Sequence, residues 1–139
     1  MLTVLRDEYG IASVLSDSAG VFLNDTTKIG SIGVQVRHRL TTHGFAFNVT
    51  REPLAWFRQI VASGLADMKA ECMENAMGEP ITVCEVIPPL MDTFGRIYGK
   101  EMEEMDPERE GEIGELIREL EEEAIAMGEW TKEPLVNAR

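Results

Sequence analysis

The sequence is poor in cysteine and in long apolar runs, and each scarcity excludes a class of protein. Two cysteines in 139 residues are too few for a disulfide framework, so Cys72 and Cys84 are expected to be reduced thiols. No apolar run is long enough to form a transmembrane helix, so no membrane span is expected. The opening stretch, MLTVLRDEYG, has neither the pattern of a secretory signal peptide nor the Arg/Ser-rich character of a transit peptide.

Basic residues are also scarce, and the acidic excess is unevenly placed. The chain has 13 Lys and Arg against 25 Asp and Glu, which gives a formal net charge of −12. Residues 101–139 carry 14 of the acidic and 4 of the basic residues, so the tail is strongly acidic and the body is nearly neutral. Without a basic patch, a nucleic-acid partner is not expected. His, Cys and acidic residues nowhere show the spacing of a metal site, so no metal is expected either.

What the chain does have is the length and composition of one globular domain. Hydrophobic residues make up 44% and charged residues 27%, which is ordinary for a protein with a buried core. The sequence shows no internal repeat. The only low-complexity segment is the Glu-rich one near the C-terminus.

The most informative stretch runs from Lys28 to Val49 and predicts two strands joined by a turn. Apolar and β-favouring residues fill its first half, and the polar Arg37-His38-Arg39 interrupts the pattern. In the second half large residues alternate with small ones, so one face of the strand is large and the other small. The glycines inside the strands remove side chains and allow another group to approach the backbone closely.

The remaining patterns predict short helices and strands around this pair. A helix is expected up to Tyr9, ended by Gly10, and another is expected after Pro53. A helix opened by Pro88 is predicted from the spacing of Leu90, Phe94 and Ile97. Strands are expected over Ile11–Leu15, Val21–Leu23 and Ile81–Val86, and a further helix is expected over Leu65–Met77. The strand over Ile81–Val86 would place Cys84 in the core.

The acidic tail predicts one more amphipathic helix. Asp106-Pro107 is a suitable cap and first turn, and Gly128 can end the helix. Its opposite faces differ sharply, because one is rich in Glu and the other carries an apolar stripe of Ile113, Leu116, Ile117, Leu120, Ala124 and Met127.

At the central stretch the sequence resembles a known family. Lys28-Ile29-x-Ser31-Ile32-Gly33-Val34, followed by THGFAFNV over residues 42–49, is similar to the signature of lipoyl(octanoyl) transferases. That family transfers an octanoyl group from acyl carrier protein to a lysine of lipoyl domains. The similarity runs from about Leu2 to about Glu101, so we expect residues 1–102 to be the C-terminal part of an octanoyltransferase-like domain and residues 103–139 an acidic amphipathic helical extension.

The resemblance carries expectations about fold, partners and setting. It implies an α+β fold of the biotin/lipoate ligase type, with a mainly antiparallel sheet packed by helices. It implies octanoyl-acyl carrier protein and the lipoyl domains of 2-oxoacid dehydrogenases or glycine cleavage proteins as partners, and no cofactor. The sequence of Val21–Val49 is most similar to that of fungal members, so a mitochondrial setting is expected.

The resemblance also implies catalytic positions. The family uses a cysteine thiolate that first takes the acyl group, beside a lysine whose positive charge favours the thiolate. Lys28 matches the lysine, whereas Ser63 stands where the cysteine is expected. A serine hydroxyl is far less acidic, so it can react only if Lys28 is neutral and acts as a base. Cys72 lies near this region, but a thiol flanked by Glu71 and Glu74 is a poor thiolate.

The acyl pocket of the family maps onto the two central strands. Small residues on adjacent strands open a slot, and apolar neighbours suit an alkyl chain. Tight strand packing explains the same glycines without any ligand. His43 is either a catalytic base or a strand residue that holds a hydrogen bond. The matching pocket positions are Ser31, Ile32, Gly33, Gly44, Phe45 and Ala46.

The sequence departs from the family in one further respect. The Arg-Gly-Gly-Gln segment and the Gly-Pro-Gly turn of the family's N-terminal half have no counterpart here. We therefore expect either a fragment, a chain that folds with a partner, or an acidic C-terminal helix that covers the surface left open. A transferase and a catalytically degenerate binding subunit both fit these observations. A cofactor ligase fits less well, because no glycine-rich phosphate loop is visible.

Overall fold

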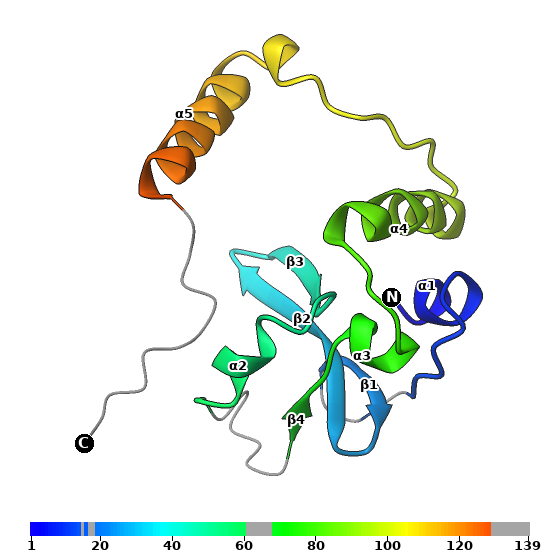
Figure 1. Ribbon diagram of the computed structural model, residues 1–139. Coiled ribbons are helices and arrows are strands. Elements are labelled where there is room, and N and C mark those ends of the chain that lie inside the picture. The colour runs from blue at the N-terminus through cyan, green and yellow to red at the C-terminus, as the bar shows by residue number, and fades with distance from the viewer. Residues whose placement is uncertain (15, 17–18, 61–67, 129–139) are drawn as a thin grey trace.

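The structure is a computed structural model that describes residues 1–14, 16, 19–60 and 68–128 of the chain. The described part has an α+β fold, in which an open, mainly antiparallel sheet packs against helices (Figure 1). None of its helices is both long and apolar enough to cross a membrane.

The sheet is built around one long strand. Strand β2 (Thr27–Arg37) pairs antiparallel with β1 (Val21–Asn24) and with β3 (Leu40–Phe47), as the sequence predicts. The short strand β4 (Lys69–Ala70) lies parallel to the beginning of β2. Since β1 pairs only with the first part of β2, the far half of the β2–β3 hairpin has no further strand beside it in the described part.

The hairpin closes at the predicted polar turn. The two central residues, His38 and Arg39, both have positive φ, at 50° and 68°. A two-residue turn with this backbone matches the right-handed twist of the strands on either side. The register that follows pairs Ile32 with Phe45 and Gly33 with Gly44.

The core lies at the base of this sheet. Helix α1 (Leu2–Asp7), helix α3 (Met73–Met77) and the start of helix α4 (Val83–Tyr98) supply apolar side chains to it. The Asn48 side chain donates a hydrogen bond to the Glu71 carbonyl at 2.9 Å, which ties the end of β3 to the segment before α3. The buried cluster comprises Leu5, Ile11, Val21, Ile29, Val49, Met73, Ile81 and Val86.

Two predicted elements are wrong in this region. Residues Ile81–Val86 do not form a strand, because Thr82 and Glu85 form a capping box that starts α4 at Val83. Helix α4 therefore begins before Pro88, which lies inside it together with Pro89, and Cys84 is exposed on the first turn.

The prolines leave carbonyl groups of α4 without their usual amide donors. Pro89 cannot donate to the carbonyl of Glu85 four residues earlier. The hydroxyl of Tyr9 donates to that same Glu85 carbonyl at 3.3 Å. This hydrogen bond joins the segment after α1 to α4.

The helix predicted over Leu65–Met77 is also wrong where the chain is described. The amides of Lys69 and Glu71 donate to the carbonyls of Thr26 and Lys28, so this segment is strand β4. Cys72 is extended, with φ of −129°, and the helix starts only at Met73. Gly78 ends α3 in the left-handed conformation.

Other predictions are met in shortened form. Of the strand expected over Ile11–Leu15, the described residues keep one bridge, between Val14 and Phe22. The helix after Pro53 is the single turn α2 (Leu54–Phe57), with Leu54 buried.

The C-terminal segment forms a separate helical arm in Figure 1. A 3-10 turn, η2 (Pro107–Arg109), is capped by Asp106, whose carboxylate accepts from the Glu108 amide. Helix α5 (Glu112–Met127) follows, and Gly114 lies so close to the Pro107 carbonyl that a Cβ there would overlap it. The apolar stripe of α5 is exposed, so the helix does not cover the body in this structure.

Candidate functional site

Lys28 lies where three strands meet. On β2 it pairs with Phe22 of β1 on one side and with Ala70 of β4 on the other. Its carbonyl accepts the Glu71 amide at 2.9 Å. Its backbone is therefore fixed on both edges, in the most tightly connected part of the sheet.

The side chain of Lys28 is held as well. Its Nζ donates to the carbonyl of Ala19 at 2.8 Å and lies 5.7 Å from the ring centre of Phe22. The backbone of Gly20 packs against the Lys28 stem so closely that a Cβ there would clash with it. The lysine is half-buried, with its charged end directed at a backbone acceptor.

Beyond Lys28 the hairpin has two different faces. Because side chains alternate along a strand, the register separates large residues from small ones. We call one face the large-residue face, which carries Ile32, Val34, Val36, His43 and Phe45. The small-residue face carries Ser31, Gly33, Gly44 and Ala46, and toward the hairpin tip also Gln35, Arg37, Leu40 and Thr42.

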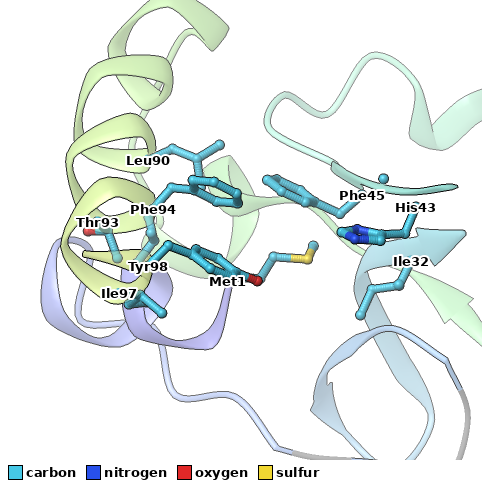
Figure 2. Close-up of a pocket in the computed structure, with 11 residues that line it drawn as sticks. Met1, Ile32, His43, Phe45, Leu90, Thr93, Phe94, Ile97 and Tyr98 are labelled. Carbon is cyan, nitrogen blue, oxygen red and sulfur yellow. The ribbon is translucent and has the colours of Figure 1, made fainter. Parts of the chain in front are cut away.

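The large-residue face borders a groove of about 620 Å³. Ile32, His43 and Phe45 project across it toward Phe94 and Tyr98 of α4 (Figure 2). The rings of Phe94 and Tyr98 lie 4.5 Å apart between centres and form an aromatic wall. The remaining lining is also mostly apolar: Met1, Val4, Gly44, Leu90, Thr93 and Ile97.

The small-residue face is open. A Cβ built on Gly33 or Gly44 would meet no atom within 4 Å among the described residues. Neither glycine has the positive φ that would demand glycine, so their small size is not required by the backbone. The missing side chains leave free space over the strands.

The structure thus divides the six predicted pocket residues between two faces. Ile32 and Phe45 line the groove beside α4, where Gly44 contributes its backbone. Ser31, Gly33 and Ala46 lie on the small-residue face, opposite the groove. No sequence pattern indicated that the aromatic wall of α4 faces the hairpin, although the helical spacing of Leu90, Phe94 and Ile97 marked that side of the helix.

The predicted nucleophile, Ser63, lies outside the described residues. The chain is described again from residue 68 and enters β4, which pairs directly with Lys28.

The two thiols differ in access. Cys72 is fully buried, and this burial, with a smaller contribution from Glu71 and Glu74, raises the pKa of its thiol. Cys84 is exposed on α4. Among the described residues no group of three or more His, Cys, Asp or Glu side chains is placed to hold a metal ion.

Comparison with curated proteins gives a consistent family signal. The chain is 33% identical over 100 residues to an octanoyltransferase of Caldicellulosiruptor saccharolyticus, which covers 70% of this chain and 42% of that protein. It is 33% identical over 113 residues to the octanoyltransferase of Desulforamulus reducens, covering 81% of this chain and 49% of the relative. No protein-family model matches the chain.

A human protein is similar over a shorter stretch. It is named octanoyl-(acyl-carrier-protein):protein N-octanoyltransferase, mitochondrial, and is 38% identical over 79 residues, or 57% of this chain and 33% of the human protein. The chain spans less than half the length of each of these relatives. It is therefore similar to octanoyltransferases over part of their length.

Proposed function

We infer that this chain supplies the Lys28-containing part of an octanoyltransferase, which moves an octanoyl group from acyl carrier protein to a lysine of lipoyl domains in protein lipoylation. The observation that carries this proposal is the placement of Lys28. The residue that matches the family lysine lies at the junction of β1, β2 and β4, next to the open strands of the hairpin. The similarity to octanoyltransferases over 70 to 81% of the chain supports it.

The fold supports the same proposal at a coarser level. An open, mainly antiparallel sheet with packed helices is compatible with the biotin/lipoate ligase type. The partners would be octanoyl-acyl carrier protein and the lipoyl domains of 2-oxoacid dehydrogenases or glycine cleavage proteins. A mitochondrial setting follows only from the human relative, since bacterial relatives are equally similar.

We propose the small-residue face as the binding site of the acyl chain. Lys28 lies three positions before Ser31 on β2, so its side chain alternates onto the other face at the beginning of the hairpin. Ser31, Gly33, Gly44 and Ala46 leave room above the strands, and an alkyl chain needs contact area rather than hydrogen bonds. The large-residue face is already bordered by α4, as expected of a face that packs against a helix. In this arrangement Ile32 and Phe45 lie on the other face of the hairpin, toward α4.

The chemistry proposed for the site is a covalent relay. The nucleophile attacks the thioester carbonyl of octanoyl-acyl carrier protein, and the carrier's thiol leaves with a proton. The lysine amine of a lipoyl domain then attacks the acyl-enzyme, which forms the amide and frees the nucleophile. Ser63 occupies the nucleophile position by resemblance, so Lys28 would have to take its proton.

Ser63 at the nucleophile position and the open hairpin favour a second function, that of a binding subunit. Cys72 is buried and cannot substitute as the nucleophile in the folded protein. The far half of the hairpin offers exposed apolar residues, and no further strand of the described part pairs with its edges, which suits a binding surface. The alternative is thus a catalytically degenerate family member that acts as a binding or partner subunit.

Intact-protein mass spectrometry after incubation with octanoyl-acyl carrier protein separates the two functions. A mass gain of one octanoyl group, lost in Ser63→Ala and in Lys28→Met but kept in Cys72→Ala, supports the relay. No gain in a folded sample rules out the relay for this chain alone and favours the binding subunit. In that case a pull-down with octanoyl-acyl carrier protein and with an isolated lipoyl domain shows which of them it binds.

A further inference from the structure

Helix α5 presents an apolar stripe to solvent. Ile113, Leu116, Leu120 and Met127 recur at helical spacing on one side of the helix and are between 52 and 68% exposed. Such a stripe opposite a charged face is typical of a helix that packs against another surface. The described part of the chain leaves it uncovered in the observed position of the arm.

The body presents an apolar surface of matching character. On the large-residue face Val34 and Val36 are 66 and 69% exposed, and Ile32 and Phe45 are less so. The groove continues this face toward Phe94 and Ile97 of α4, both partly exposed (Figure 2). A helix laid along the face would cover both walls.

The charges of the two surfaces are complementary. The hairpin from Thr27 to Phe47 contains three basic residues, Lys28, Arg37 and Arg39, and no acidic one. Helix α5 contains six glutamates and one arginine. Arg39 stands in the turn at the tip of the hairpin, so it can meet the Glu-rich sides of a helix whose stripe covers the valines. Arg37 pairs with Leu40 on the other face of the hairpin.

The tether permits this contact. Helix α5 follows α4 after the thirteen residues Gly99–Gly111, and α4 ends at Tyr98, on the border of the groove. Thirteen extended residues span up to about 45 Å, whereas the sixteen residues of α4 measure only about 24 Å. A short tether also gives a high effective concentration, on the order of millimolar.

We propose that α5 docks its apolar stripe onto the large-residue face and groove of its own chain, with its glutamates toward Arg39 at the hairpin tip. This surface is opposite the small-residue face, where we place the acyl chain, so the docked helix leaves that face open. The arm then has two positions, one extended and one docked. The docked helix covers the exposed valines and the aromatic wall of α4 together.

Paramagnetic NMR on the full chain tests the docking. Cys84→Ser removes the exposed thiol, and a nitroxide on Glu119→Cys then reports which backbone amides come near α5. We expect a severalfold intensity loss for amides around Val36 and Leu40, weakened at high salt because the charges are screened. Leu120→Glu, on the stripe, should abolish this loss. Ile125→Glu, an identical charge change off the stripe at a residue 80% exposed, should keep it.

Two results overturn the proposal. One is a hairpin without intensity loss, or with the same loss in Leu120→Glu. The other comes from mixing spin-labelled chains with isotope-labelled chains that carry no nitroxide. A loss that appears to full extent in this mixture means that α5 binds a second copy rather than its own chain. Circular dichroism confirms that α5 stays helical in both glutamate variants.

Discussion

The backbone carbonyl of Lys28 accepts a hydrogen bond from the amide of Glu71 at 2.9 Å. This contact joins the residue that matches the family lysine to the segment that follows the predicted nucleophile loop. It also explains why the chain around Cys72 is extended rather than helical. The parallel pairing of β4 with β2 competes with the helical pattern of the local sequence and prevails, because it satisfies backbone groups on both segments.

The start of α4 gives the first prediction. Thr82→Ala removes the hydroxyl that accepts from the Glu85 amide, and the loss of such a cap costs about 1 kcal/mol of unfolding free energy. Thr82→Ser keeps the acceptor and should retain most of the stability. Urea denaturation of the three proteins measures the difference. Equal stability of the alanine and serine variants would show that the capping box does not stabilise the fold.

The second prediction concerns acid stability. The backbone and side-chain hydrogen bonds from Arg51 hold the pKa of Glu74 below its ordinary value of 4.5. The unfolded chain therefore binds a proton at Glu74 more readily than the folded chain does. The stability that ionised Glu74 adds to the fold is complete above pH 4.5 and is lost as the pH falls below that value. Glu74→Gln should flatten this part of the stability curve, measured by denaturation from pH 6 to pH 3. Glu79→Gln serves as the control, since Glu79 is exposed.

The thiols give a third prediction. In the folded protein a thiol reagent should modify Cys84 rapidly and Cys72 slowly, because Cys72 is fully buried and its burial raises the thiol pKa. Cys84→Ser should remove the fast phase and leave the slow one. Denaturant should make both thiols react at similar rates. A fast phase that persists in Cys84→Ser would mean that the segment around Cys72 opens readily.

Particular residues show what the sequence could predict and what it could not. The hairpin was predictable, because alternation and the polar Arg37-His38-Arg39 turn are local signals. The strand predicted at Ile81–Val86 was wrong because its four β-branched residues were given more weight than the capping box of Thr82 and Glu85. That capping box is also a local signal and is visible in the sequence. Strand β4 was not predictable, since its partner lies some forty residues away in the chain.

The candidate site followed the same division. The motif placed Lys28 and the pocket residues on adjacent strands, and the structure agrees. Alternation along the strands separates Ile32 and Phe45 from Ser31 and Gly33, but it could not show which of the two faces borders a groove, because that requires the position of α4. The assignment of Ser63 as a nucleophile stays a prediction.

The small-residue face gives the last prediction. Gly33→Val adds a β-branched side chain where a Cβ meets no neighbour, so the fold should keep or slightly gain stability. If the acyl chain lies on this face, the same valine fills its space. Octanoyl binding or acyl-enzyme formation should then fall severalfold, as measured by intact-protein mass spectrometry or by titration with octanoyl-acyl carrier protein.

Thr41→Val is the matched control, because Thr41 pairs with Val36 on the large-residue face and is also exposed. It adds β-branched apolar surface to the same hairpin without entering the small-residue face, so acyl binding should stay unchanged. Loss of binding in Thr41→Val but not in Gly33→Val would move the acyl seat to the groove beside α4. Since both variants are expected to fold, thermal unfolding of each separates a blocked site from a damaged sheet.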